Sequence, residues 1–131
     1  MEIKADKKVL TSKEAPKAVG PYSLGIQTGN FVFLSGQLGI DPQTGDFIQG
    51  GVEKQTEQVL TNLKNILMSN DMSMGDIVKT TVFLQDMKDF PSMNAVYSIF
   101  FEDDPPARST IQVAALPKGG LIEIEAIAVP G

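Results

Sequence analysis

The sequence predicts an α+β protein in which two helices cover one face of a β-sheet. Two observations predict this fold class. Apolar residues recur at helical spacing in residues 52–70 and 90–101, whereas the other apolar segments are short, rich in β-branched residues and bounded by glycine, proline or asparagine. With 131 residues, 42% of them hydrophobic, the chain is predicted to form a single domain spanning residues 1–131.

The first quarter of the chain is predicted to supply an edge strand and a central strand. Residues 1–16 mix charges with a short apolar patch, so we expect a frayed start that leads into an edge strand. A Gly-Pro pair at residues 20 and 21 predicts a turn that presents Tyr22, by itself interpreted as a half-buried aromatic residue. Residues 31–37 are apolar on both faces and contain a serine and a glycine near their end, which indicates a central strand.

Two helices enclose a further strand. The first helix is predicted over residues 52–70, and a strand with β-branched or aromatic residues on both faces follows at residues 77–84. The second helix has Asp89 and Pro91 in its first turn. Asn94 lies beside its apolar stripe and is interpreted as hydrogen-bonding to a loop. The stripe itself consists of Phe90, Met93, Tyr97, Phe100 and Phe101.

The last two predicted strands, residues 108–115 and 121–129, carry an arginine and two glutamates within otherwise apolar segments. Side chains alternate along a strand, so Glu123 and Glu125 share one face of the second strand. Arg108 lies beside an apolar run and needs an anionic partner. Burying an unpaired cation costs roughly several kcal/mol of folding free energy. That partner is either one of the two glutamates or a small carboxylate gripped by the guanidinium, with a glutamate free to act on water.

The sheet pattern predicts an oligomer. Two helices cover only one face of the sheet, yet the strands at residues 31–37 and 77–84 are apolar on both faces. Burying each such side chain contributes roughly 1.5 to 3 kcal/mol. We therefore expect another copy of the same chain to cover the second face.

Composition excludes several kinds of chemistry. The chain has no cysteine and no histidine, which excludes disulfides, thiolate sites and serine-histidine-aspartate triads, and we expect no metal site. A net charge of −5 argues against nucleic-acid binding. Neither a membrane span nor the apolar core of a signal peptide is visible, so we expect a cytoplasmic protein without membrane contact.

Several segments together resemble one known family, the RidA family of reactive-intermediate deaminases, also called YjgF-like proteins. The resemblance covers nearly the whole chain, and its most specific part is PARS followed by IEIEA at this spacing. The matching segments are APKAVGPYSLG at 15–25, FLSGQLGIDPQTG at 33–45, GDIVKTTVFLQDM at 75–87, MNAVYSIFF at 93–101 and PARSTIQVAALPKGGLIEIEAIA at 106–128.

This resemblance implies a chorismate-mutase-like α+β fold assembled as a homotrimer, with clefts between neighbouring subunits. The strand at residues 77–84 would then lie between the last two strands. The implied activity is that of a 2-iminobutanoate/2-iminopropanoate deaminase, which hydrolyses 2-imino acids or their enamine tautomers to 2-oxo acids and ammonia. No cofactor is expected, since an imine carbon is already electrophilic.

The resemblance also assigns roles to residues. It implies that Arg108 binds the substrate carboxylate and that Glu123 positions and deprotonates water, while Glu125 is structural. Many members have an aromatic residue where this chain has Pro105, and a cysteine two positions after the arginine, where this chain has a threonine. The first departure affects the cleft wall, and the second leaves the core reaction possible. The implied substrate-binding residues beside Arg108 are Tyr22, Ser35, Gly36, Asn94 and Thr110.

Two other functions remain open at this level. One is a non-catalytic trimeric module that binds small carboxylates or a partner protein, since fold alone does not fix function. Arg108 together with Glu123 favours the enzyme, because a module that only binds needs only the arginine. The other is the ribonuclease activity ascribed to some relatives, which the acidic balance disfavours.

Overall fold

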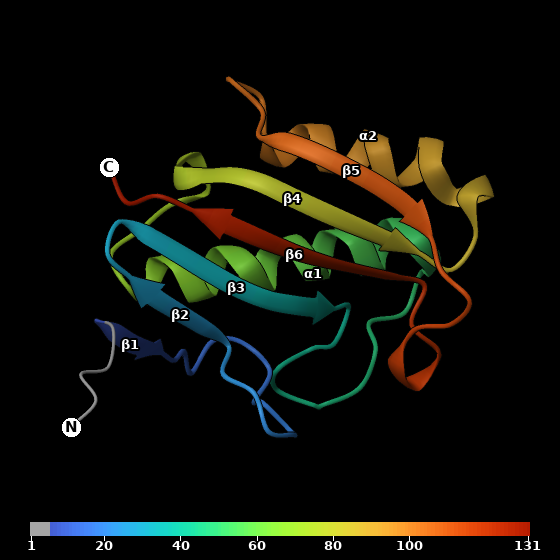
Figure 1. The fold of residues 1–131 in the computed structure, drawn as a ribbon. Coiled ribbons are helices and arrows are strands. Elements are labelled where there is room, and N and C mark those ends of the chain that lie inside the picture. The colour runs from blue at the N-terminus through green and yellow to red at the C-terminus, as the bar shows by residue number, and fades with distance from the viewer. Residues whose placement is uncertain (1–5) are drawn as a thin grey trace.

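Six strands form one sheet, and two helices lie against one of its faces (Figure 1). The computed structural model describes residues 6–131. This arrangement confirms the α+β class and the predicted order of strands and helices, except that β2 was not predicted. The strands are β1 (Lys7–Leu10), β2 (Gly25–Thr28), β3 (Phe31–Leu38), β4 (Ile77–Leu84), β5 (Ala107–Gln112) and β6 (Ile122–Ala128); the helices are α1 (Gly51–Met68) and α2 (Phe90–Phe100), with short 3-10 turns η1 (Met74–Asp76), η2 (Met87–Asp89) and η3 (Pro117–Gly119).

The order of strands in the sheet is β1-β2-β3-β6-β4-β5. Strand β4 therefore lies between β6, its antiparallel neighbour, and β5, its parallel neighbour, as the resemblance implied. The predicted edge position of β1 is also confirmed. Because β5 forms the other edge, its outer side has no partner strand among residues 6–131.

Two predicted boundaries were too long. Strand β5 ends at Gln112 rather than at residue 115, because its partner β4 ends at Leu84, the residue paired with Gln112. Helix α1 ends at Met68, two residues before the predicted end. The chain turns there through Asp71, whose φ of 62° is incompatible with a continuing right-handed helix.

The hydrophobic core lies between the helices and one face of the sheet. Its fully buried members include Val32, Val82, Leu84, Ile122 and Ile124 from the strands, and Leu60, Leu63, Ile66, Leu67 and Met93 from the helices. No helix or strand of the described part of the chain covers the opposite sheet face. There Phe31, Phe33 and Ile111 are 53%, 44% and 45% exposed. Within residues 6–131, neither helix combines the length and apolar character needed to cross a membrane.

Candidate active site

An irregularity in β3 places two small residues at the centre of the candidate site. Leu34 pairs with Ala126 and Gln37 with Ile124, so Ser35 and Gly36 together lie opposite the single residue Glu125. Two residues opposite one define a β-bulge, which bends the strand and redirects its side chains. The bulge breaks the regular alternation of β3 and opens the sheet surface beside β6.

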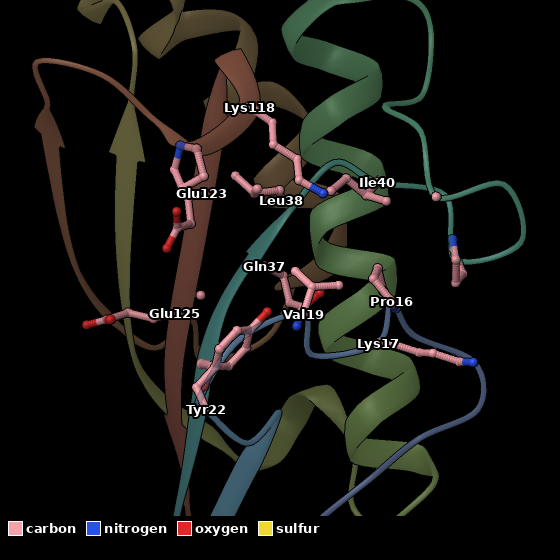
Figure 2. Close-up of a pocket in the computed structure, with 15 residues that line it drawn as sticks. Pro16, Lys17, Val19, Tyr22, Gln37, Leu38, Ile40, Lys118, Glu123 and Glu125 are labelled. Atoms are coloured by element: carbon pink, nitrogen blue, oxygen red, sulfur yellow. The ribbon is translucent and has the colours of Figure 1, made fainter.

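A cavity of about 660 Å³ lies over this bulge (Figure 2). Its polar side chains include Tyr22, Ser35, Gln37, Glu123 and Glu125, with Gly36 among them, and they come from the loop before β2, from β3 and from β6. The remaining wall is mostly apolar and includes Val19, Leu38, Ile40 and Pro117, with Lys17 and Lys118 as its cations. Four of the predicted site residues, Tyr22, Ser35, Gly36 and Glu123, are therefore brought together by the fold.

Glu123 is the partly buried acid of this cavity. Burial raises the pKa of its carboxyl above the ordinary value of 4.5, and the neighbouring charge of Glu125 raises it further. Glu125 is exposed and points outward in Figure 2, away from Tyr22. A carboxyl whose pKa is raised in a cavity is a candidate for proton exchange with water.

Gly36 allows the Glu123 carboxylate to lie directly against the backbone of the bulge. A Cβ atom at this position would overlap Oε2 of Glu123 and lie 2.8 Å from its Cδ. The absence of a side chain at Gly36 thus fixes where the carboxylate sits. This is a close-approach role for glycine, and it does not depend on an unusual backbone angle.

We predict that Gly36→Ala lowers kcat of a reaction that uses the Glu123 carboxylate by about a hundredfold, because a displacement of about 1 Å in a reacting group has an effect of that size. The displaced group is the end of a flexible side chain, so the thermal midpoint should change little. Steady-state kinetics and calorimetry measure the two effects. Gly75→Ala is the matched control, since a Cβ there meets its nearest atom at an ordinary 3.7 Å. Unchanged kcat in Gly36→Ala would contradict this account of Glu123.

Ser35 has a defined hydrogen-bonding role. Its hydroxyl donates to the Ser23 carbonyl over 2.6 Å, and its backbone N–H donates to the Leu24 carbonyl over 3.0 Å. With its proton engaged, the hydroxyl oxygen presents lone pairs to the cavity. It is thus suited to accept a hydrogen bond from an N–H group of a ligand.

Two buried side-chain amides of α1, which the sequence reasoning missed, hydrogen-bond to backbone at or next to the cavity lining. The Asn62 side chain donates to the Leu38 and Ile40 carbonyls over 3.2 and 3.0 Å. On the other side, Oε1 of Gln55 accepts from the Leu121 backbone N–H over 3.0 Å. A signal for both was present, because they are polar residues within the span of the first apolar stripe.

Arg108 lies apart from this cavity, between β5 and α2. One guanidinium nitrogen donates to Oδ1 of Asn94 over 2.7 Å, and the guanidinium carbon lies 4.7 Å from the ring centre of Tyr97 and 5.5 Å from that of Phe90. Asn94 therefore bonds to a strand residue and not, as interpreted from the sequence, to a loop. In residues 6–131 the ion pair found is Lys54 with Glu57, and no carboxylate pairs with Arg108.

A single chain does not bring Arg108 and Glu123 together. Arg108 is paired with Thr80, which is buried under the helices, whereas Glu123 is paired with Phe83 on the uncovered face. The two side chains therefore lie on opposite faces of the sheet. Thr110 lies two residues after Arg108 on the same face of β5, and its buried hydroxyl has no hydrogen-bond partner among the described residues.

The predicted site residues thus form two groups, one in the cavity and one at β5 and α2. The sequence reasoning missed Phe90 and Tyr97 in the second group, since they were interpreted as core alone. Their positions four residues before and three residues after Asn94 place all three on one helix face, which was the available signal. Residues 6–131 contain no group of three or more acidic side chains placed to hold a metal ion.

The mixed six-stranded sheet, the bulge beside β6 and the arginine-glutamate segment define a class of small α+β proteins. The chain belongs to the RidA (YjgF-like) family, whose family model, described as Endoribonuclease L-PSP, matches residues 12–130. This confirms the resemblance inferred from the sequence.

Individual relatives cover almost the whole chain. A RutC family protein of Pyrococcus horikoshii is 50% identical over 122 residues, which are 93% of this chain and 97% of that protein. The 2-iminobutanoate/2-iminopropanoate deaminase of Mus musculus is 46% identical over 125 residues, 95% of this chain and 93% of that protein. Among solved structures, E. coli TdcF with bound serine is 44% identical, covers 95% of this chain and 99% of its own, and has a TM-score of 0.90.

Proposed function

We propose that the protein hydrolyses 2-imino acids, or their enamine tautomers, to 2-oxo acids and ammonia, with 2-iminobutanoate and 2-iminopropanoate as substrates. The observation that carries the proposal is the Glu123 carboxylate, partly buried against Gly36 in an otherwise open cavity. The deaminase name of the mouse relative and the serine bound in TdcF support a small amino-acid-like substrate. A module that only binds carboxylates has no use for an acid in this position.

The proposed enzyme is a homotrimer whose active sites are shared between subunits. Arg108 and Glu123 lie on opposite faces of one chain, so a second subunit is needed to place a guanidinium before the cavity. The exposed Phe31, Phe33 and Ile111 on the uncovered sheet face support such an assembly, because their burial between subunits removes apolar surface from water.

Arg108 grips the substrate carboxylate in this proposal. Asn94 is a neutral acceptor, so it does not offset the guanidinium charge, and among residues 6–131 only one guanidinium nitrogen is hydrogen-bonded. The other donors are free for a two-pronged bond to a carboxylate, and a charged hydrogen bond contributes about 1.5 to 3 kcal/mol. Arg108 thereby fixes one end of the substrate.

Glu123 moves the protons of the hydrolysis. It takes a proton from water while the water oxygen bonds to the carbon of the protonated imine and the C=N electron pair moves to nitrogen. Glu123 then returns that proton to the amino nitrogen, and the C–N bond breaks with its electron pair leaving on ammonia. Glu123, ionised again, takes the hydroxyl proton as the C=O bond forms and then passes it to the released ammonia, which leaves as ammonium. Ser35 accepts a hydrogen bond from the imine nitrogen, with Tyr22 closing the same side of the cavity.

A coupled assay tests the activity. Threonine dehydratase releases the imine of 2-oxobutanoate, and an NADH-dependent 2-oxo-acid reductase reports the 2-oxobutanoate that forms. We expect the protein at micromolar concentration to accelerate this formation above the spontaneous rate. No acceleration would exclude the proposed deaminase activity and favour the non-catalytic binding module.

The shared site makes a stricter prediction. Light scattering should give three times the 14.1 kDa mass of the chain, and a monomer mass would contradict the assembly. Arg108→Ala and Glu123→Gln chains, each inactive alone, should regain activity when refolded together. In a cyclic trimer every mixed assembly has one site with both wild-type groups, so equal mixing should restore about one quarter of the wild-type activity. No restoration would show that each site uses one chain only.

The pH dependence of kcat/KM should report the pKa of Glu123. The base must be ionised, so activity falls as the pH decreases through that pKa, which burial and Glu125 raise and the Arg108 charge of the neighbouring subunit lowers. Glu125→Gln removes a negative charge that, together with burial, raises the pKa of Glu123. The acid limb should therefore move to lower pH in Glu125→Gln, while kcat at neutral pH changes little. A limb that stays in place would mean that another group controls it.

A further inference from the structure

The Arg108 guanidinium lies against an aromatic surface supplied by α2. Its carbon is 4.7 Å from the ring centre of Tyr97 and 5.5 Å from that of Phe90. Both distances lie within the roughly 6 Å range of cation–π attraction. Neither ring brings a negative charge, so the contact orients the cation without neutralising it.

Tyr97 is the more firmly held of the two rings. It is 5% exposed, and its hydroxyl is hydrogen-bonded to the fully buried Thr80 hydroxyl over 2.7 Å. Its ring also packs against Phe101, with ring centres 4.7 Å apart. Burial raises the pKa of the Tyr97 phenol, while the Thr80 hydrogen bond and the Arg108 charge lower it, and the net shift is upward. The ring therefore stays neutral at neutral pH.

Thr80 also connects this support to the strand that carries Arg108. Thr80 on β4 is the register partner of Arg108 on β5, so the hydroxyl that fixes Tyr97 belongs to the residue directly beside the arginine. The guanidinium, the ring and the buried hydroxyl pair form one continuous set of contacts. Asn94 adds a hydrogen bond from the same helix.

We infer that Tyr97 is a positioning residue that sets the plane of the Arg108 guanidinium for the substrate carboxylate. This inference rests on the proposed deaminase function and adds a residue to it. The N–H donors of a guanidinium point outward in its own plane, where a carboxylate accepts two of them, so a ring that restricts the guanidinium also directs these donors. Without the ring, the same charge remains, but the guanidinium is free to rotate among orientations that do not suit the substrate.

The test compares three single variants by KM, by kcat and by the inhibition constant of the product 2-oxobutanoate. Tyr97→Leu removes the ring and should raise KM and the inhibition constant by about five- to thirtyfold, with kcat within about twofold. Tyr97→Phe keeps the ring, so its KM, kcat and inhibition constant should stay within about twofold of those of the wild-type protein. Phe90→Leu, at the more distant and partly exposed ring, should give a smaller increase than Tyr97→Leu.

Phe101→Leu is the matched structural control. It removes an aromatic ring that packs against Tyr97 and is not in stacking contact with Arg108, so it should lower stability without raising KM. An equal KM increase in Phe101→Leu and Tyr97→Leu would overturn the inference, as would an unchanged KM in Tyr97→Leu. If Tyr97→Leu does not fold, an unchanged KM in Phe90→Leu overturns it instead. The wild-type assay tests the proposed function separately: if the wild-type protein does not hydrolyse the imine, the proposed deaminase function fails.

Discussion

Arg108→Ala should reduce kcat/KM for the imine by about thirty- to several-thousandfold, since loss of one partner of a desolvated charge pair has that effect. The guanidinium is the group that the substrate carboxylate would bind, and no carboxylate of residues 6–131 competes for it. The dehydratase-coupled assay measures the loss. Arg108→Lys should be intermediate, because lysine keeps the charge but lacks the planar fork.

The fold and the assembly should survive Arg108→Ala, since Arg108 is bonded to Asn94 and to no ion-pair partner. Light scattering and thermal unfolding check this point. Lys64→Ala removes a cation from the outer side of α1 and should leave activity unchanged. Retained activity in Arg108→Ala would mean that the substrate carboxylate binds elsewhere.

Glu123→Gln should lower kcat by about a hundred- to ten-thousandfold, the usual contribution of a general base. Glutamine has nearly the same shape and still hydrogen-bonds to water, but it does not take a proton from it. KM should change little, because the carboxylate of the substrate is held by Arg108. Steady-state kinetics in the dehydratase-coupled assay measures this loss of kcat.

Glu125→Gln is the control for this loss of kcat. It changes the neighbouring acid on the same strand face, which is more exposed than Glu123 and points away from Tyr22. Wild-type kcat at neutral pH is expected for this control. Equal losses in the two variants would mean that the pair acts as a unit, and a Glu123→Gln enzyme with normal kcat would exclude Glu123 as the base.

The sequence predicted most of the fold because its signals are local. Alternation placed Glu123 and Glu125 on one face of β6, and the apolar stripes located both helices within two residues of their ends. The position of β4 between β6 and β5 was different. It joins strands that are distant in the sequence, so no local pattern indicates it, and it came from the family resemblance.

The candidate site was predictable in its residue types but not in its geometry. Residue chemistry singled out Arg108 and Glu123, yet only strand register shows that they lie on opposite faces of one sheet. The bulge that aims Ser35 at the cavity depends on a register shift against β6, for which Gly36 was the single local sign. The role of Tyr97 was hidden because an aromatic residue on a helix stripe is usually core.

The opposite orientation of Arg108 and Glu123 also bears on how activity depends on the amount of protein. If neither group serves its own chain, a newly synthesised or strongly diluted monomer is inert, and specific activity falls steeply once the concentration drops below the dissociation constant of the assembly. Halving expression in a cell near that threshold would then remove more than half of the deaminase capacity.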